Sequence, residues 1–337
     1  MKQGNLSERY LKNSIFRQIP KTNQKLLVGA GIGNDFSLTE NADSTASVGG
    51  ETVTSMSGLV TADGAGECPE VAFYKAYNNF LCSLGNCDYA RIAYFLPKEC
   101  KDSKIKAYST TFAELAKEEK IQIVGGNSLV SSSFQTPNFL VTLFGRSSEN
   151  YRPNKKAICP GFDIVHIGFT GILGTNLLLD KYEDALSQRF TAAFLQGARF
   201  PQSSYRVQDL LKVITEHDLI SQSKICYIHD VSFGGIYLAL WQLGEFIGKG
   251  FLIENGKIPL RQETVEICEY LDKNPYYIDG MGGMLLVCEK GSVVTKLLNE
   301  KGVMAKVIGR ITEGKERLVK ITENDIRTLS AEADGFL

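Results

Sequence analysis

The stretch from His229 to Val287 constrains the fold of this chain more than any other segment. It begins with a histidine–aspartate pair and a glycine pair, followed by an amphipathic segment and a glycine-flanked apolar run. An Ile-Pro step, a second amphipathic segment, an Asn-Pro-Tyr turn and a glycine-rich apolar run complete it. This order predicts strand, helix, strand, helix and strand, an alternation that is typical of layered α/β domains.

Hydrophobic patterning predicts the same alternation elsewhere. Residues 6–19 carry a helical stripe of apolar side chains, and residues 26–38 predict two strands around a glycine turn. A helix is predicted to begin at Pro69 and to end with Gly85 as its C-cap. Residues 121–126 predict a strand that ends in a glycine turn. We therefore expect an α/β (α+β) fold in which each sheet is covered mainly on one face.

A polar segment punctuated by prolines, residues 147–161, is the best candidate for a linker. The chain has 337 residues, which is long enough for two domains with separate cores. We therefore expect one domain over residues 1–150, a second over 151–325 and a tail over 326–337.

Charge and hydropathy exclude several classes of partner. The 37 basic residues nearly cancel the 38 acidic ones, so electrostatics gives no reason to expect binding to nucleic acid or to an anionic membrane. No apolar run approaches the roughly 20 residues that span a bilayer. The polar start of the sequence lacks the hydrophobic core of a signal peptide, so we expect a cytoplasmic protein.

The eight cysteines are scattered and include no C-x-x-C pair. Cys82 and Cys87 have a spacing that suits zinc poorly. Cys226, Cys268 and Cys288 lie in apolar runs, which favours buried thiols over ligands or disulfides.

The glycine-rich turn that ends at Asp35 allows two interpretations. Its glycines could let backbone N–H groups approach a phosphate, but the pattern is neither a P-loop nor a dinucleotide fingerprint, and a plain turn explains it as well. Asp63 likewise could face a ligand or could simply end a strand before Gly64.

The pair His229–Asp230 precedes the glycines that open the next helix. A histidine at that position could orient a substrate or bind an anion, or it could be a hydrogen-bonded structural residue. A second glycine-rich segment includes Gly282 and Gly283.

Residues 229–287, together with these turns, closely resemble the AIR synthetase (PurM-like) superfamily. The resemblance is greatest to its HypE-like and AIR synthase-related branch. It implies an N-terminal domain whose sheet pairs with its twin in a homodimer, and a C-terminal α/β domain. Family members use ATP to phosphorylate an amide- or carbonyl-type oxygen and then displace the phosphate.

The resemblance also assigns roles to single residues. Asp35 and Asp63 match acidic residues that bind magnesium and ATP, so they are the implied metal ligands. His229 and Asp230 are implied as catalytic residues. The implied nucleotide-binding residues are Asp35, Asp63, Asn79, Gly125, Gly126 and Asn127, and the implied substrate loop contains Gly234, Gly235, Gly282 and Gly283.

Several polar positions of the family are missing here. Phe80 stands where relatives have an aspartate, and Leu129 stands where they have a glutamate. In the second domain Ile167, Gly168 and Leu173 replace a threonine, a lysine and a glutamate. Magnesium needs hard oxygen ligands, which these side chains do not offer. HypE itself ends in a reactive cysteine, whereas this sequence ends in EADGFL.

Three hypotheses follow from this pattern. The first is a ligand- or partner-binding homodimer with an eroded ATP–magnesium site. The second is an active ATP-dependent enzyme that phosphorylates an amide or carbonyl oxygen of a small substrate. The third is a structural subunit that pairs with an active paralogue or with a maturation partner.

Overall fold

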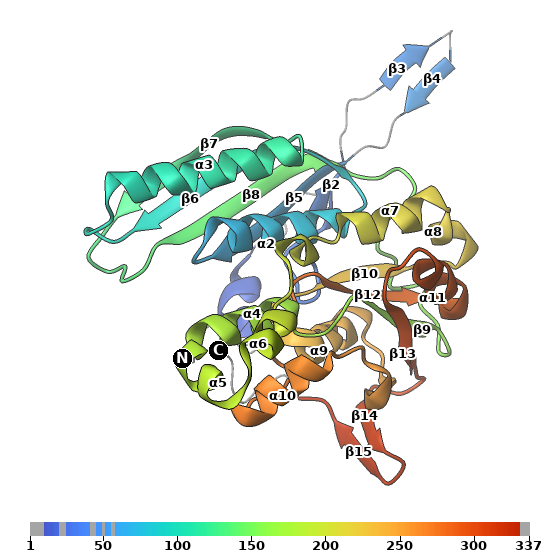
Figure 1. Ribbon diagram of the computed structural model, residues 1–337. Helices are drawn as coiled ribbons and strands as arrows, with labels where there is room; N and C mark the ends of the chain where they lie inside the picture. Colours follow the sequence, from blue (N-terminus) through green and yellow to red (C-terminus); the bar gives the residue numbers. More distant parts are fainter. Residues whose placement is uncertain (1–9, 20–24, 41–44, 49–50, 55–57, 331–337) are drawn as a thin grey trace. The chain divides into compact units, whose positions relative to one another are not determined.

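The computed structural model describes residues 10–19, 25–40, 45–48, 51–54 and 58–330 (Figure 1). The chain divides into two compact units. The N-terminal unit comprises Lys21–Ala30 and Asn34–Arg152, and the C-terminal unit comprises Met1–Pro20, Gly31–Gly33 and Pro153–Leu337.

The N-terminal unit is built on a six-stranded sheet with the strand order β1-β2-β5-β8-β6-β7. Its pairs are antiparallel except for the parallel pair β6–β7 at one edge. Strands β3 and β4 form a separate antiparallel hairpin. The strands are β1 Leu26–Val28, β2 Ser37–Thr39, β3 Thr45–Val48, β4 Glu51–Thr54, β5 Leu59–Gly66, β6 Asn86–Leu96, β7 Gln122–Val130 and β8 Asn138–Arg146.

Two helices, α2 (Pro69–Leu81) and α3 (Asp102–Glu118), lie on the same face of this sheet (Figure 1). Strand β8 alternates buried and half-buried residues along its length, as a strand with one covered face should. Phe80, Phe112 and Phe139 are among the fully buried side chains beneath these helices. No helix in the described part of the N-terminal unit covers the opposite face, which we call the open face.

The C-terminal unit contains a seven-stranded sheet with the order β10-β12-β9-β13-β11-β14-β15. Only β11 and β14 pair in parallel in this sheet. Its strands are β9 Asp163–Ile167, β10 Tyr227–Val231, β11 Phe251–Glu254, β12 Gly283–Cys288, β13 Ala305–Ile311, β14 Arg317–Thr322 and β15 Asp325–Thr328.

Helix α9 (Gly235–Ile247) supplies much of the core of this unit. Its buried Ile236, Leu240 and Leu243 belong to one apolar cluster with Leu285 and Val287 of β12. The other helices are α4 Ile172–Lys181, α5 Glu183–Arg189, α6 Ala192–Ala198, α7 Gln208–Glu216, α8 Leu219–Gln222, α10 Gln262–Tyr270 and α11 Gly291–Glu300. The short helical turns are η1 Leu11–Ile15, η2 Phe16–Gln18, η3 Gln202–Tyr205 and η4 Asn255–Lys257.

The predicted α/β class is confirmed, and the local predictions need three corrections. Helix α2 ends at Leu81 and not at Gly85, because the chain turns through Leu84 with a φ of 52°. The glycines predicted to form a turn after Val124 lie inside β7, which continues to Val130. Asp63 lies within β5 and does not end it.

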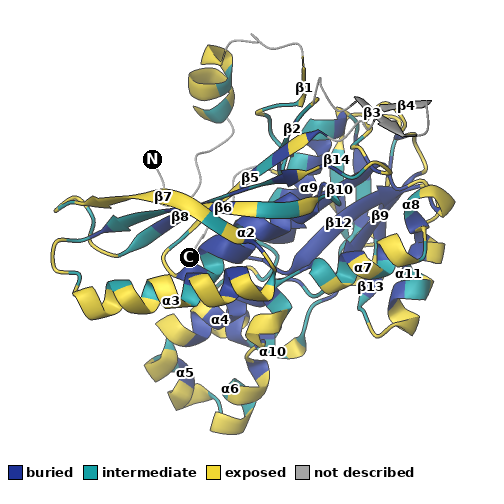
Figure 2. Cartoon of the chain, turned by 90° about the horizontal axis from the view of Figure 1, so that it is seen from above, coloured by how far each residue is buried: buried dark blue, intermediate teal, exposed yellow. Residues whose placement is uncertain are grey.

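The predicted one-sided cover holds for the N-terminal sheet but is wrong for the centre of the C-terminal sheet. Every residue of β9, β10 and β12 is buried, so both faces of these strands are covered (Figure 2). The helix predicted over residues 6–19 falls partly outside the described residues, which show the turns η1 and η2 from residue 11 onward. None of the helices in the described ranges is both long and apolar enough to cross a bilayer.

Candidate functional site

The two predicted metal ligands belong to neighbouring segments of the N-terminal unit, Asp35 just before β2 and Asp63 inside β5. Strands β2 and β5 are antiparallel, with Ser37 opposite Thr61. Asp35 comes two residues before Ser37, and Asp63 comes two residues after Thr61. Because side chains alternate along a strand, Asp63 shares a face of β5 with Thr61, whereas Asp35 lies just outside β2, two residues before its first residue. We call Asp35 and Asp63 the carboxylate pair.

Hydrogen bonds fix the position of Asp63. The Oγ1 of Thr142, directly opposite on β8, donates to Asp63 Oδ1 at 2.5 Å. The Nδ2 of Asn79, near the end of α2, donates to the backbone carbonyl of Asp63 at 3.0 Å. Asn79 thus ties its helix to the strand that carries the metal-ligand candidate. Asp63 is exposed and Asp35 is half-buried.

The replaced acidic positions offer no further ligand. Phe80 is fully buried in the core of the N-terminal unit, where a Cβ added at Gly145 would lie 2.8 Å from its Cζ. Leu129 lies on β7 with 51% of its surface exposed. Among the residues that the structure describes, no group of three or more His, Cys, Asp or Glu side chains could hold a metal. Two carboxylates suit one magnesium ion if water and phosphate oxygens complete its shell.

The other predicted nucleotide-binding residues lie farther along the sheet. Gly125, Gly126 and Asn127 belong to the edge strand β7. The register runs from Asp63 to Thr142, then to Arg91, then to Gly125. Three strand spacings separate Asp63 from Gly125, or about 14 Å. The structure therefore separates Gly125, Gly126 and Asn127 from the carboxylate pair.

The predicted catalytic pair is buried in the C-terminal unit. His229 and Asp230 on β10 are each only 3% exposed. The Nε2 of His229 lies 3.0 Å from Oε1 of Gln242 on α9, and its ring stacks on Tyr227 with centroids 5.6 Å apart. Since the amide oxygen only accepts, Nε2 carries the proton. The contact with α9 holds the ring within the packed sheet–helix interface.

The two predicted glycine segments meet beside this pair. Gly235 has a φ of 64° at the start of α9, and Gly282 has a φ of 102°, a region that favours glycine. The backbone N–H of Gly280 donates to the carbonyl of Ser232 at 3.1 Å. Val231 pairs with Gly283 at the end of the β10–β12 ladder. The structure therefore brings the sequence-predicted residues of this unit together at one end of its sheet.

His166, which has no chemical neighbours in the sequence, lies near this group. On β12, Leu285 pairs with His229 on one side and with His166 on the other, so both rings share a face of the sheet. His166 is fully buried, and burial lowers its pKa to about 4. Its Nε2 would lie 3.2 Å from a Cβ added at Gly283. The sequence hides this proximity, because the three strands are not consecutive in the chain.

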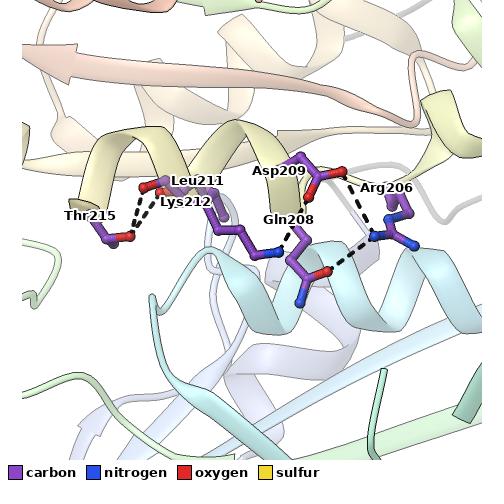
Figure 3. Close-up of polar contacts among 6 residues, drawn as sticks. All are labelled: Arg206, Gln208, Asp209, Leu211, Lys212 and Thr215. Atoms are coloured by element: carbon purple, nitrogen blue, oxygen red, sulfur yellow. Dashed lines mark hydrogen bonds and ion pairs between the residues drawn. The ribbon is translucent and has the colours of Figure 1, made fainter. Parts of the chain in front are cut away.

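Two other polar features lie away from the predicted residues. At the start of α7, Asp209 forms ion pairs with both Arg206, at 3.8 Å, and Lys212, at 3.4 Å (Figure 3). These pairs balance charges on a solvated helix.

A cavity of about 520 Å³ lies among α4, α5 and α6, where Asp180 pairs with Arg199 at 2.6 Å.

The cysteines predicted to be buried are confirmed as such. Cys226, Cys268 and Cys288 have 7%, 0% and 0% of their surface exposed. Burial raises the pKa of Cys268 and that of Cys288 to about 12, so both are protonated at neutral pH. A protonated thiol is a poor nucleophile.

Comparison with known proteins identifies the fold. Residues 160–321 match the family described as "AIR synthase related protein, C-terminal domain". The carbamoyl dehydratase HypE of Rhodobacter capsulatus is 31% identical over 85 residues, which are 24% of this chain and 25% of that protein. The predicted resemblance to the AIR synthetase superfamily is confirmed. The C-terminal half of the chain thus resembles the AIR synthase-related family, and the chain matches only about a quarter of the length of the curated HypE relative.

Solved structures agree with this assignment of the fold. A HypE–HypF complex contains a chain with a TM-score of 0.68 and 16% identity, covering 83% of this chain and 92% of that chain. A HypE structure in complex with ATP gives a TM-score of 0.66 and 15% identity, covering 98% of this chain and 96% of that chain.

Proposed function

We propose that this protein is a HypE-like, PurM-type homodimer that binds ATP with a single magnesium ion. In this proposal the carboxylate pair holds the ion, and the ancestral phosphoryl-transfer chemistry is eroded. The observation that carries the proposal is that Asp35 and Asp63 each lie two residues from the paired Ser37 and Thr61 of neighbouring strands, while Phe80 and Leu129 supply no oxygen ligand.

The nucleotide is suggested by the relatives and by the chemistry of the pair. A similar HypE structure contains ATP. Magnesium is commonly held by one or two carboxylates together with substrate phosphates and water. The bond from Thr142 to Oδ1 orients the Asp63 carboxylate, so Oδ2 can face a cation. A second ion would need oxygen ligands that the replaced positions do not provide.

The open face supports the homodimer. It carries Leu59 with 45% and Tyr89 with 50% of their surfaces exposed, together with the half-buried Leu140 and Phe144. Exposed apolar side chains gathered on one sheet face favour association. A second copy would bury the same patch on both partners around a two-fold axis.

Calorimetric titration with Mg–ATP tests the nucleotide site. Wild-type protein should bind, and the double variant Asp35→Asn plus Asp63→Asn should lose the magnesium-dependent part of the affinity. Rapid release of ADP from the wild type, at a rate typical of ATP-dependent enzymes, would contradict erosion. That result would favour the second candidate, an active enzyme that phosphorylates an amide or carbonyl oxygen with His229 and Asp230 placing the substrate.

Light scattering tests the homodimer. Leu59→Glu on the open face should shift the mass toward the monomer. Val293→Glu on α11 is a matched control, because Val293 is 42% exposed and lies in the other unit. Equal masses for both variants and the wild type would contradict a dimer formed by the open face.

A protein partner is the remaining candidate, favoured by the HypE–HypF complex among the similar structures. Co-purification with a second protein, lost in the open-face variant and retained in the control, would replace the homodimer with that assembly. We propose a cytoplasmic setting for either assembly.

A further inference from the structure

We infer that Tyr227 anchors the glycine turn that leads to Asp35 and is thereby a positioning residue for that carboxylate. The inference rests on the proposed magnesium site, because it names the residue that holds the loop of one ligand. The sequence allows two interpretations of the turn, a phosphate-binding loop and a plain turn. Its contacts support a third, in which the tip of the turn is packed into the C-terminal unit.

The tip of the turn, Gly31–Gly33, belongs to the C-terminal unit, whereas the residues on both sides of it belong to the N-terminal unit. Ile32 packs against the apolar cluster that α9 forms with β12. At the base of the turn, the Nδ2 of Asn34 donates to the carbonyl of Gly29 at 2.8 Å, which closes the loop. Asp35 follows directly after Asn34. A residue that holds the tip therefore also restrains the backbone of Asp35.

Tyr227 on β10 holds the tip through its hydroxyl group, which donates a hydrogen bond to the carbonyl of Gly33. Its ring stacks on Phe246 with centroids 4.3 Å apart and on His229 with centroids 5.6 Å apart. Tyr227 is only 2% exposed, so packing sets the direction of its hydroxyl. The backbone of the tip is thus held by a buried side chain whose own position is fixed.

The packing around Gly33 explains why a glycine stands at the tip. Its φ of 76° lies in the region that favours glycine. A Cβ added there would lie 2.8 Å from the carbonyl oxygen of Gln242 and 3.0 Å from the Cβ of Phe246, both on α9. The close approach of α9 therefore accounts for this glycine without a phosphate.

The anchor also explains the surroundings of the buried His229. Its Nε2 lies 3.0 Å from Oε1 of Gln242, and its ring stacks on Tyr227. Tyr227 reaches the tip through its hydroxyl, and the backbone carbonyl of Gln242 lies close to Gly33. His229 therefore supports both residues that hold the tip.

Hydrogen exchange on the full chain tests the anchor without any ligand. The amides of residues 29–35 should exchange severalfold faster in Tyr227→Phe than in the wild type, because the hydroxyl that holds the tip is removed. Tyr237→Phe is the matched control. Tyr237 is also buried and stacked, on Tyr276, and its hydroxyl donates to Asn255 at 2.6 Å. This control should leave exchange in the turn at the wild-type rate.

Calorimetry tests whether the anchor positions Asp35 for a cation. The affinity for a non-hydrolysable ATP analogue is measured with magnesium and with EDTA, and the ratio of the two affinities reports on the metal ligands. Tyr227→Phe should lower this ratio about three- to tenfold, the factor that corresponds to one neutral hydrogen bond. A purely structural role would lower the melting temperature and leave the ratio unchanged, as Tyr237→Phe should.

A second variant alters the same contact from the side of the turn. Gly33→Ala should give both results, because the added Cβ would push the tip away from α9. Gly256→Ala is its control, since a Cβ added at Gly256 meets nothing within 4 Å. This second pair decides the question if Tyr227→Phe does not fold.

The outcomes separate this inference from the proposed function. Exchange in the turn at the wild-type rate in Tyr227→Phe and in Gly33→Ala overturns the anchor. Faster exchange with an unchanged magnesium ratio overturns the positioning of Asp35. If the wild type binds the analogue equally with magnesium and with EDTA, the proposed metal site fails and the positioning of a ligand fails with it. Faster exchange in that case still upholds Tyr227 as the anchor of the turn.

Discussion

The two sheets of this chain place their candidate functional residues in opposite environments. The N-terminal sheet has helices on one face, and Asp63 and Thr142 lie on the other. The central strands of the C-terminal sheet are buried on both faces, and His229 is only 3% exposed there. The first group lies outside the core of its unit, whereas the second group is part of a core. Substitutions on the open face can therefore change the chemistry of the N-terminal unit without unfolding it. Substitutions around His229 should instead destabilise the fold of the C-terminal unit.

The largest effect should come from truncating equivalent leucines in the two sheets. Leu285→Ala removes a fully buried side chain from β12 and should lower the free energy of unfolding by about 2–5 kcal/mol. Leu140→Ala on the half-buried open face should cost well under half as much, because less apolar area returns to water. Chemical denaturation followed by circular dichroism measures both, and similar losses would break the comparison.

The next effect concerns acid stability in the C-terminal unit. Burial lowers the pKa of His166 to about 4, whereas an unfolded histidine titrates near pH 6.5. The unfolded chain therefore takes up this proton first, and the free energy of unfolding should fall by up to about 3 kcal/mol between pH 6.5 and pH 4.

Denaturation at several pH values, in wild type and in His166→Leu, isolates this contribution from that of the carboxylates. The variant should show a smaller decrease over this interval. A wild-type slope in His166→Leu would mean that the buried ring does not govern the acid response.

The smallest effect should come from the open face. Thr142→Val removes the hydrogen bond to Asp63 and should change the free energy of unfolding by less than about 1 kcal/mol, because the pair is exposed. Mg–ATP affinity should nevertheless fall severalfold, since the carboxylate loses its orientation. Thr61→Val, on the same face, serves as the control for both thermal denaturation and calorimetry. A large stability loss without an affinity loss would assign Thr142 a structural role.

The sequence predicted most elements because their apolar periodicity is local. It failed where long-range packing decides the structure. The glycine pair after Val124 looks like a turn, yet Gly126 lies against the carbonyl of Ile92 in a paired strand where a side chain would not fit.

The site was predictable only in part for the same reason. Asp35 and Asp63 were predicted through the family resemblance, and the register of β2 and β5 puts each of them two residues from the paired Ser37 and Thr61. The proximity of His166 to His229 depends on strand order, which no local pattern reveals.

The number of divalent ions bound with the nucleotide tests the central claim most directly. Manganese, as a paramagnetic substitute for magnesium, can be counted by electron paramagnetic resonance in the presence of a non-hydrolysable ATP analogue. The placement of the carboxylate pair, with Phe80 and Leu129 at the replaced positions, predicts one ion per chain, lost in Asp35→Asn plus Asp63→Asn. Two ions per chain, bound with similar affinity, would contradict an eroded site.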